Sequence, residues 1–196
     1  MTDLSSEETA LVAVQALLVD RPGVLPAARG LSHFGEHALG WMGAAALGAL
    51  LDRRHRQEYV TAGVGAFGAH AASVVIKRIV RRKRPDHPAI AVGVGTPSRL
   101  SFPSSHATSS TAAAILLGRA SGLPGGALLG VAAVVPPMLT SRLVLGVHYP
   151  TDVAAGAAIG AVSAAVAIEG ERLWRQRSRG RAPGRLSTRT KGQRTA

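Results

Sequence analysis

The stretch Ala120–Ser141, ASGLPGGALLGVAAVVPPMLTS, runs for 22 residues without a charged side chain. A helix needs about 20 mainly apolar residues to cross a bilayer, so this stretch predicts a transmembrane helix. A second stretch, Tyr59–Ile76 (YVTAGVGAFGAHAASVVI), is equally free of charged side chains. Together they indicate an integral membrane protein.

Three more apolar stretches complete the pattern, namely Leu31–Leu51, Phe102–Gly118 and Tyr149–Ile168. Taken singly, each could be a buried helix of a soluble all-α protein, because the first contains Glu36, the second is short and the third contains Asp152. Five such stretches with short hydrophilic joints favour a membrane bundle. The predicted fold class is therefore an all-α integral membrane helical bundle, with about five transmembrane helices plus an N-terminal amphipathic helix.

Two features suit helices packed in a bilayer. Gly156 and Gly160 lie four residues apart, and small residues at this spacing let helix backbones approach closely in lipid. Trp41 and Trp174 are predicted to anchor helices at the membrane interface, where tryptophan is enriched.

The chain divides into three predicted segments. Residues 1–30 form an amphipathic, interfacial segment, in which Glu8–Asp20 reads as a helix that packs on the body or lies on the membrane surface. No charged region precedes this helix, so a cleavable signal peptide is not expected. Residues 31–170 form the membrane-embedded domain. Residues 171–196 form a basic tail that is expected to be disordered.

The formal net charge of +12 is concentrated in two clusters. Of the 23 lysines and arginines, nine lie in Arg172–Arg194 and six in Lys77–Arg84. This distribution favours contact of the tail with anionic lipid head groups over specific nucleic-acid binding. Arg81, Arg82 and Lys83 are likewise expected to meet head groups rather than substrate.

The positions of the basic residues also predict orientation in the cell (inner) membrane. If all five stretches span, Arg53–Arg56 and the C-terminal tail share one face, which the positive-inside rule assigns to the cytoplasm. The loop Lys77–Pro103 and the turn Leu145–His148 then lie on the extracytoplasmic face.

Three short segments carry the chemistry: Lys77-x6-Arg84-Pro85, Pro103-Ser104-Ser105-His106 and Ser141-Arg142-x5-His148-x3-Asp152. Arginine offers forked hydrogen bonds to phosphate and lysine a point charge. The backbone N–H groups of Ser104 and Ser105 open a helix, where anions bind well. These groups together predict a phosphate site.

The candidate nucleophile is His148, because the chain has no cysteine and a serine would need an adjacent base. Asp152 lies four residues further on, which on a helix is one turn along the same face. It would fix the imidazole tautomer and leave the other ring nitrogen free to attack. His106, on the opposite side of the phosphate, would protonate the leaving oxygen and later activate water.

The three segments resemble the signature motifs of the type 2 phosphatidic acid phosphatase superfamily, the lipid phosphate phosphatases: K-x6-R-P, P-S-G-H and S-R-x5-H-x3-D. The match covers Lys77 to Asp152 in order and spacing. The resemblance implies a metal-independent phosphatase without cofactors and a phosphohistidine at His148. It assigns His106 as acid and Asp152 as the orienting carboxylate. The residues that it implies bind phosphate are Lys77, Arg84, Ser104, Ser141 and Arg142, to which the helix-opening Ser105 is added from its backbone N–H.

Ser105 departs from the family pattern, which has glycine before the acid histidine. Serine disfavours positive φ, so the detailed geometry of this loop is the feature that the departure affects. The run Leu100–Ser109 (LSFPSSHATS) further resembles actinobacterial members of the family that act on a polyprenyl-linked sugar phosphate. That lipid is the expected substrate, with undecaprenyl pyrophosphate and glycerolipid phosphates as alternatives. The expected partners are this substrate and membrane lipids, and the oligomeric state stays open.

Several other polar residues have more than one interpretation. His33 and His37 are four apart with Glu36 between them, but no third ligand is evident, which favours a structural or interfacial role over a metal site. His70 either lines the substrate groove or makes a polar contact between helices. A catalytically inactive, lipid-binding scaffold on the same fold is the alternative from another class, and the complete His and Asp set argues against it.

Overall fold

The computed structural model describes residues 4–180, with side chains up to residue 178. Within this range the chain is helical, and the only β pairing described is an isolated bridge between Lys83 and Leu100. The predicted all-α fold class is confirmed. The elements are α1 (Ser6–Leu18), α2 (Val24–Phe34), the 3-10 helix η1 (Glu36–Ala38), α3 (Leu39–Leu51), α4 (Arg56–Val80), α5 (Ser105–Ala120), α6 (Gly126–Val144) and α7 (Pro150–Gly180).

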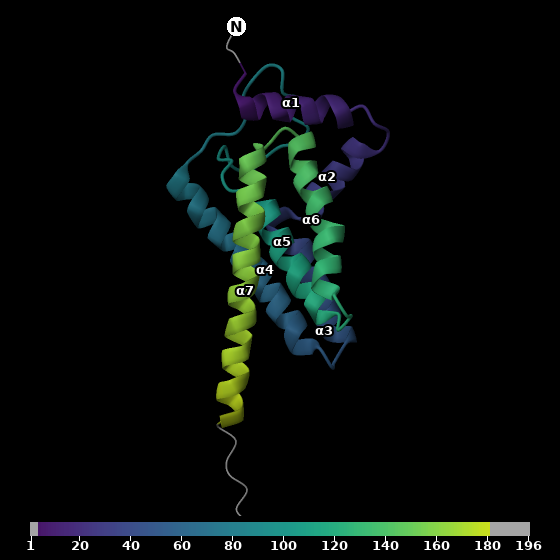
Figure 1. Cartoon of the computed structure of the whole chain (residues 1–196), viewed down its shortest axis with the longest axis vertical. Helices are drawn as coiled ribbons and strands as arrows, with labels where there is room; N and C mark the ends of the chain where they lie inside the picture. Colours follow the sequence, from purple (N-terminus) through teal and green to yellow (C-terminus); the bar gives the residue numbers. More distant parts are fainter. Residues whose placement is uncertain (1–3, 181–196) are drawn as a thin grey trace, which may run out of the picture.

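Helix α5 is the centre of the bundle. It packs against α4, α6 and α7, which surround it along the length of the molecule (Figure 1). The contact with α7 is very close, since a Cβ added at Gly156 would lie 2.7 Å from the Ser104 carbonyl oxygen and one at Gly160 would collide with the Thr108 carbonyl. The predicted backbone approach at these two glycines is confirmed, and it brings the start of α7 beside the start of α5.

Three helices, α4, α6 and α7, are long and apolar enough to cross a membrane by length and composition. Helices α3 and α5 have 13 and 16 residues, short of the roughly 20 that a full span needs. The protein is therefore a membrane protein, while the expected number of about five spans stays a prediction. Large apolar side chains project outward from the three long helices, as lipid-facing residues do: Val64, Phe67, Val75, Leu128, Leu129, Val162 and Val166.

The first predicted span, Leu31–Leu51, is not one helix. Helix α2 begins before it and ends at Phe34, so it also crosses the predicted boundary at residue 30. The chain then turns through η1 with positive φ at His37 (49°) and Ala38 (62°) before α3 begins. Two consecutive residues in the left-handed region break the helical path, and Gly35, just before the break, packs on the His106 ring.

The boundary of the basic tail is also corrected. Residues 171–180, predicted to be disordered, continue α7. Ion pairs hold this end of the helix, because Arg175 lies 2.5 Å from both Glu58 and Glu171, and Glu171 lies 2.7 Å from Arg119. The rest of the predicted tail, residues 181–196, lies outside the described residues.

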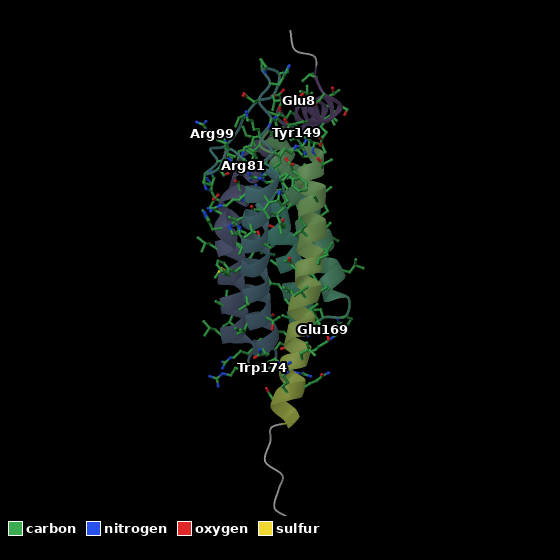
Figure 2. The ribbon with its side chains drawn as sticks, turned by 90° about the vertical axis from the view of Figure 1, so that its left-hand side faces the viewer. Glu8, Arg81, Arg99, Tyr149, Glu169 and Trp174 are labelled. Carbon is green, nitrogen blue, oxygen red and sulfur yellow. The ribbon has the colours of Figure 1, made fainter. Side chains whose placement is uncertain are left out.

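The two tryptophans differ in environment. Trp41 is buried, and its indole N–H donates to the Ser110 hydroxyl at 2.9 Å, so the prediction of an interfacial anchor is wrong there. A buried serine supplied a polar partner that the sequence pattern did not indicate. Trp174 is exposed near the end of α7, far from the end where Glu8 and Tyr149 lie (Figure 2).

Helix α1 lies across the end of the bundle where α7 begins (Figure 1). Ser5 and Glu8 close a capping box at its start. Its buried face carries Leu11 and Gln15, and the Gln15 amide donates to the carbonyls of Ala91 (2.7 Å) and Val144 (3.0 Å). The predicted packing of this amphipathic helix on the body is observed, and it covers the loops that carry the site.

Candidate active site

A cavity of about 320 Å³ opens among α2, η1, α4, α5, α6 and the loops that follow α4 and α6. Figure 2 shows many polar side chains at this end of the molecule, near the labelled Arg81 and Tyr149. Residues from all three sequence segments meet there, although they are up to 71 positions apart in the chain. Six of the nine predicted site residues line the cavity: Lys77, Arg84, Ser105, His106, Arg142 and His148.

His148 sits in the short connection between α6 and α7. The turn depends on Gly146, whose φ is +68° and whose Cβ, if present, would collide with the Ala91 carbonyl. The His148 side chain is only 2% exposed, with Nε2 3.2 Å from an Arg84 nitrogen and Nδ1 3.6 Å from Asp152 Oδ2. A guanidinium can only donate, so Nε2 is the unprotonated nitrogen and the proton is on Nδ1, which faces Asp152.

The electrostatic setting keeps His148 neutral. Burial lowers its pKa well below the usual range, and the positive charges of Arg84 and Arg142 lower it further. Burial also lowers the pKa of Arg84 to about 10, which leaves that guanidinium cationic at neutral pH. A neutral imidazole with an available Nε2 lone pair beside two cations is suited to attack a phosphorus atom.

Asp152 is fully buried behind His148 and does not line the cavity. Its Oδ2 accepts a hydrogen bond from the Tyr149 backbone N–H at 2.8 Å, and its Oδ1 accepts one from Arg82 at 3.0 Å. Both oxygens are thereby fixed. Oδ2 faces His148 Nδ1 at 3.6 Å, which is beyond hydrogen-bond distance, and the predicted hydrogen bond between them stays a prediction.

Arg82 links the carboxylate to helix α1. Its guanidinium pairs with Glu7, donates to the Thr151 hydroxyl at 2.7 Å and lies 4.0 Å over the Tyr149 ring. The expectation that Arg82 meets lipid head groups is therefore wrong. Three adjacent cations cannot be told apart by sequence pattern, and only the fold shows that the middle one turns inward to Asp152.

Replacing Arg82 by alanine is expected to lower kcat for lipid phosphate hydrolysis by about tenfold and to leave KM within about twofold. The reason is that Asp152 would lose the Arg82 hydrogen bond that orients its Oδ1. The measurement is phosphate release in detergent, with Lys83→Ala as the matched control, because Lys83 is exposed. Thermal unfolding is used to check that both variants are folded. If the two folded variants hydrolyse the substrate at equal rates, Arg82 does not position Asp152.

His106 lies in the first turn of α5 and lines the same cavity as His148. Its Nε2–H donates to the Ser32 carbonyl at 2.9 Å, and Glu36 Oε2 is 4.0 Å from the same nitrogen. Gly35 also packs on the ring, since a Cβ there would lie 2.8 Å from His106 Cδ2. The ring is thus held by α2 and the turn that follows it, and Nδ1 is the nitrogen left for proton exchange.

Arg142 is the most enclosed cation of the site, at 2% exposure. One terminal nitrogen donates to the Ser32 hydroxyl at 2.8 Å, whereas Nε has no hydrogen-bond partner among the described residues. Ser32 therefore holds both Arg142 and His106. Sequence reasoning missed Ser32, because it lies in an apolar stretch outside every motif and gives no local signal.

Three predicted phosphate ligands make hydrogen bonds to other groups of the protein in this structure. Lys77 lines the cavity, but its ammonium donates to the carbonyls of Leu100 (3.2 Å), Ser101 (3.1 Å) and Pro103 (2.9 Å), which accounts for all three donors. Ser104 is buried, and its hydroxyl caps α5 while its backbone N–H donates to the Asp152 carbonyl. Ser141 is buried, and its hydroxyl donates to the Met138 carbonyl at 2.7 Å. Their phosphate contacts stay predictions.

Ser105, the departure from the family motif, fits its position. It is the first residue of α5 and is not one of the residues with positive φ, so serine meets no backbone penalty. Its hydroxyl accepts a hydrogen bond from Ser73 at 2.8 Å.

Residues 4–180 contain no group of three or more His, Cys, Asp or Glu side chains placed to hold a metal ion. His37 instead lies 3.3 Å from Glu36, and its ring is 5.6 Å from the ring of His70. Glu36, His37 and His70 all line the cavity, so His70 takes part both in the cavity lining and in a ring contact between α4 and η1.

Comparisons with known proteins agree with this geometry. The chain is 60% identical over 175 residues to a Mycobacterium tuberculosis protein named decaprenylphosphoryl-5-phosphoribose phosphatase, covering 89% of this chain and 96% of that protein. A Mycolicibacterium smegmatis protein of the same name is 65% identical over 150 residues, covering 76% and 81%. The crystal structure of a transmembrane PAP2 type phosphatidylglycerolphosphate phosphatase from Bacillus subtilis has the same fold, with a TM-score of 0.63, 21% identity and coverage of 93% and 90%. Residues 58–175 match the PAP2 superfamily, and this chain belongs to that family.

Proposed function

We propose that this membrane phosphatase removes the 5-phosphate of decaprenylphosphoryl-5-phosphoribose, a step of cell-wall arabinan synthesis. The high identity to two relatives of that name supports the substrate. The observation that carries the chemistry is that His148 and His106 line one cavity with Arg84 and Arg142.

In the first step, Nε2 of His148 attacks the phosphorus atom. An N–P bond forms and the bond between phosphorus and the C5 oxygen breaks. His106 acts here as an imidazolium, which the negative charge of the bound phosphate favours, and it gives the C5 oxygen its Nδ1 proton. Arg84 donates to Nε2 in the structure described, so the incoming phosphate takes over this guanidinium as its own ligand and uncovers the lone pair. Arg142, with its unpartnered Nε–H, supplies a second cation for the equatorial oxygens.

In the second step, water hydrolyses the phosphohistidine. His106, now neutral, takes a proton from the water as its oxygen bonds to phosphorus, and the N–P bond breaks to return His148. Asp152 stabilises the imidazolium character of His148 in both steps through Nδ1–H. The cations that neutralise the phosphate are side chains, so no metal ion or other cofactor is required by this scheme.

We place the active site on the extracytoplasmic face of the cell membrane and the C-terminal tail in the cytoplasm. Arg54 and Trp174 line one surface pocket, which supports a shared face for the basic α3–α4 joint and the end of α7. The positive-inside rule assigns that face to the cytoplasm. His148, which lines the cavity, directly precedes Tyr149, and Tyr149 lies at the opposite end of the molecule from Trp174 (Figure 2).

The test is phosphate release by purified protein from a panel of lipids. We expect kcat/KM for decaprenylphosphoryl-5-phosphoribose to exceed those for undecaprenyl pyrophosphate, phosphatidic acid and phosphatidylglycerol phosphate by about tenfold or more, because hydrogen bonds to the sugar add transition-state binding. EDTA should leave the rate unchanged. A preference for a glycerolipid phosphate would overturn the substrate but not the reaction class.

A further inference from the structure

We infer that Glu36, His37 and His70 form a subsite for the pentose of the substrate, in which the Glu36 carboxylate accepts hydrogen bonds from the sugar hydroxyls. This inference rests on the proposed function, since it concerns how the same cavity holds the head group. None of the three residues belongs to the sequence segments that supply the reacting groups.

The cavity has a cationic region and an anionic region. Arg84 and Arg142 gather beside His148, whereas Glu36 contributes a carboxylate to the same cavity. A carboxylate repels a phosphate, so Glu36 is unsuited to the reacting group. An ionised carboxylate accepts hydrogen bonds and cannot donate them. Ribose hydroxyls can donate, and Asp and Glu side chains bind them in nucleotide sites.

The distance from Glu36 to the reacting groups suits a sugar 5-phosphate. Its Oε2 is 4.0 Å from Nε2 of His106, on the same ring whose Nδ1 is proposed to protonate the C5 oxygen. A pentose that extends from Nδ1 along this imidazole therefore brings its ring hydroxyls within reach of Glu36. The cavity volume of about 320 Å³ is at the lower end of the range for ligand pockets, which suits a head group more than a whole lipid.

His37 and His70 complete the subsite. Their ring centroids are 5.6 Å apart with the planes tilted by 55°, and both rings line the cavity. The buried Nδ1 of His70 has no hydrogen-bond partner in the described part of the chain. A neutral imidazole offers one donor and one acceptor, which matches hydroxyl groups that can do either.

The backbone holds these side chains in an uncommon conformation. His37 and Ala38 have φ of 49° and 62°, a region that non-glycine residues seldom occupy. Strained residues of this kind cluster at ligand sites, where the surrounding structure enforces them. Here the neighbouring Gly35 packs directly on the His106 ring, so the turn that presents Glu36 is fixed relative to a reacting residue.

The experiment pairs a protein variant with a substrate lacking one hydroxyl. Glu36→Gln is compared with the wild type and with Glu169→Gln, an exposed glutamate at the other end of the molecule (Figure 2). The probes are farnesylphosphoryl-5-phosphoribose, its 2-deoxy and 3-deoxy counterparts, and phosphatidic acid. In the wild type, at least one deoxy probe should lose about tenfold in kcat/KM, the size expected for a hydrogen bond to a charged group.

For Glu36→Gln, kcat/KM on the ribose probe should fall about tenfold, mainly through a higher KM. The variant should show no further loss of kcat/KM on the deoxy probe that the wild type hydrolyses more slowly. The kcat/KM of Glu36→Gln on phosphatidic acid should stay within about twofold of the wild-type value. The Glu169→Gln control should stay within about twofold of the wild type on every probe. An equal loss on all probes would mean that Glu36 acts through His106 and would overturn the subsite, as would an unchanged rate on the ribose probe. If the wild type hydrolyses phosphatidic acid but not the ribose probe, the proposed substrate fails, and the subsite with it.

Discussion

Replacing His148 by alanine is expected to lower kcat by a factor of roughly 10⁴ or more on any phosphorylated lipid. The reason is that His148 supplies the atom that bonds to phosphorus, and Arg84, Arg142 and His106 have no other nucleophile to assist. The measurement is inorganic phosphate release by detergent-purified protein. Acid-labile labelling from radiolabelled substrate should mark His148 in the wild type and be absent from the variant.

The matched control for this variant is His33→Ala, since His33 is exposed and lies outside the cavity. It should keep wild-type activity and labelling. Residual turnover above about one per cent in a folded His148→Ala protein would contradict covalent catalysis at this residue. A wild type that never carries label would instead support the inactive, lipid-binding scaffold.

The nucleophile should also work at mildly acidic pH. Because burial and the adjacent arginines depress the pKa of His148, its Nε2 stays unprotonated below the pH at which an ordinary histidine titrates. In a pH profile of kcat/KM, protonation of His148 lowers the rate at acidic pH. This fall should occur at a lower pH than it would for an exposed histidine.

The sequence predicted the juxtaposition of the reacting groups because each one lies next to an apolar helix. Lys77 ends α4, His106 opens α5 and Arg142 ends α6, so three helices packed side by side bring these residues to one end of the bundle. Spacing alone also predicted that Asp152 faces His148, although His148 precedes the helix rather than lying on it.

The supporting residues could not be predicted in the same way. Ser32 holds His106 with its carbonyl and Arg142 with its hydroxyl, contacts that join residues 74 and 110 positions apart. Arg82 looked like its exposed neighbours, and its inward turn depends on Glu7 from a distant helix. Hydropathy and local spacing report which residues are apolar or polar, whereas these roles are set by tertiary partners.

The same dependence on tertiary partners explains why the predicted ends of two segments were wrong. Residues 171–180 carry the basic composition of a solvated tail, yet α7 continues because Glu58 and Arg119 provide partners of opposite charge for Arg175 and Glu171. The stretch Leu31–Leu51 is apolar enough to suggest one helix, but it is interrupted at the turn that packs on His106.

Replacing His106 by alanine is expected to give a different defect from the loss of His148. On lipid substrates kcat should fall by about 10³-fold, within the range for a lost general acid and base, because the alkoxide leaving group needs a proton. p-Nitrophenyl phosphate has a leaving group that needs none, so the variant should still phosphorylate His148 with this probe. Hydrolysis of the phosphohistidine still requires His106 as the base, and the labelled intermediate should therefore accumulate.

Rapid-quench labelling measures this accumulation. The His106→Ala protein should carry more acid-labile phosphate per molecule at steady state than the wild type, and the double variant with His148→Ala should carry none. Low labelling together with slow p-nitrophenol release would mean that His106 assists attack rather than proton transfer. The orientation of the ring argues for the first result, since the Nε2–H bond to the Ser32 carbonyl fixes the imidazole and leaves Nδ1 to serve the leaving oxygen and then the water.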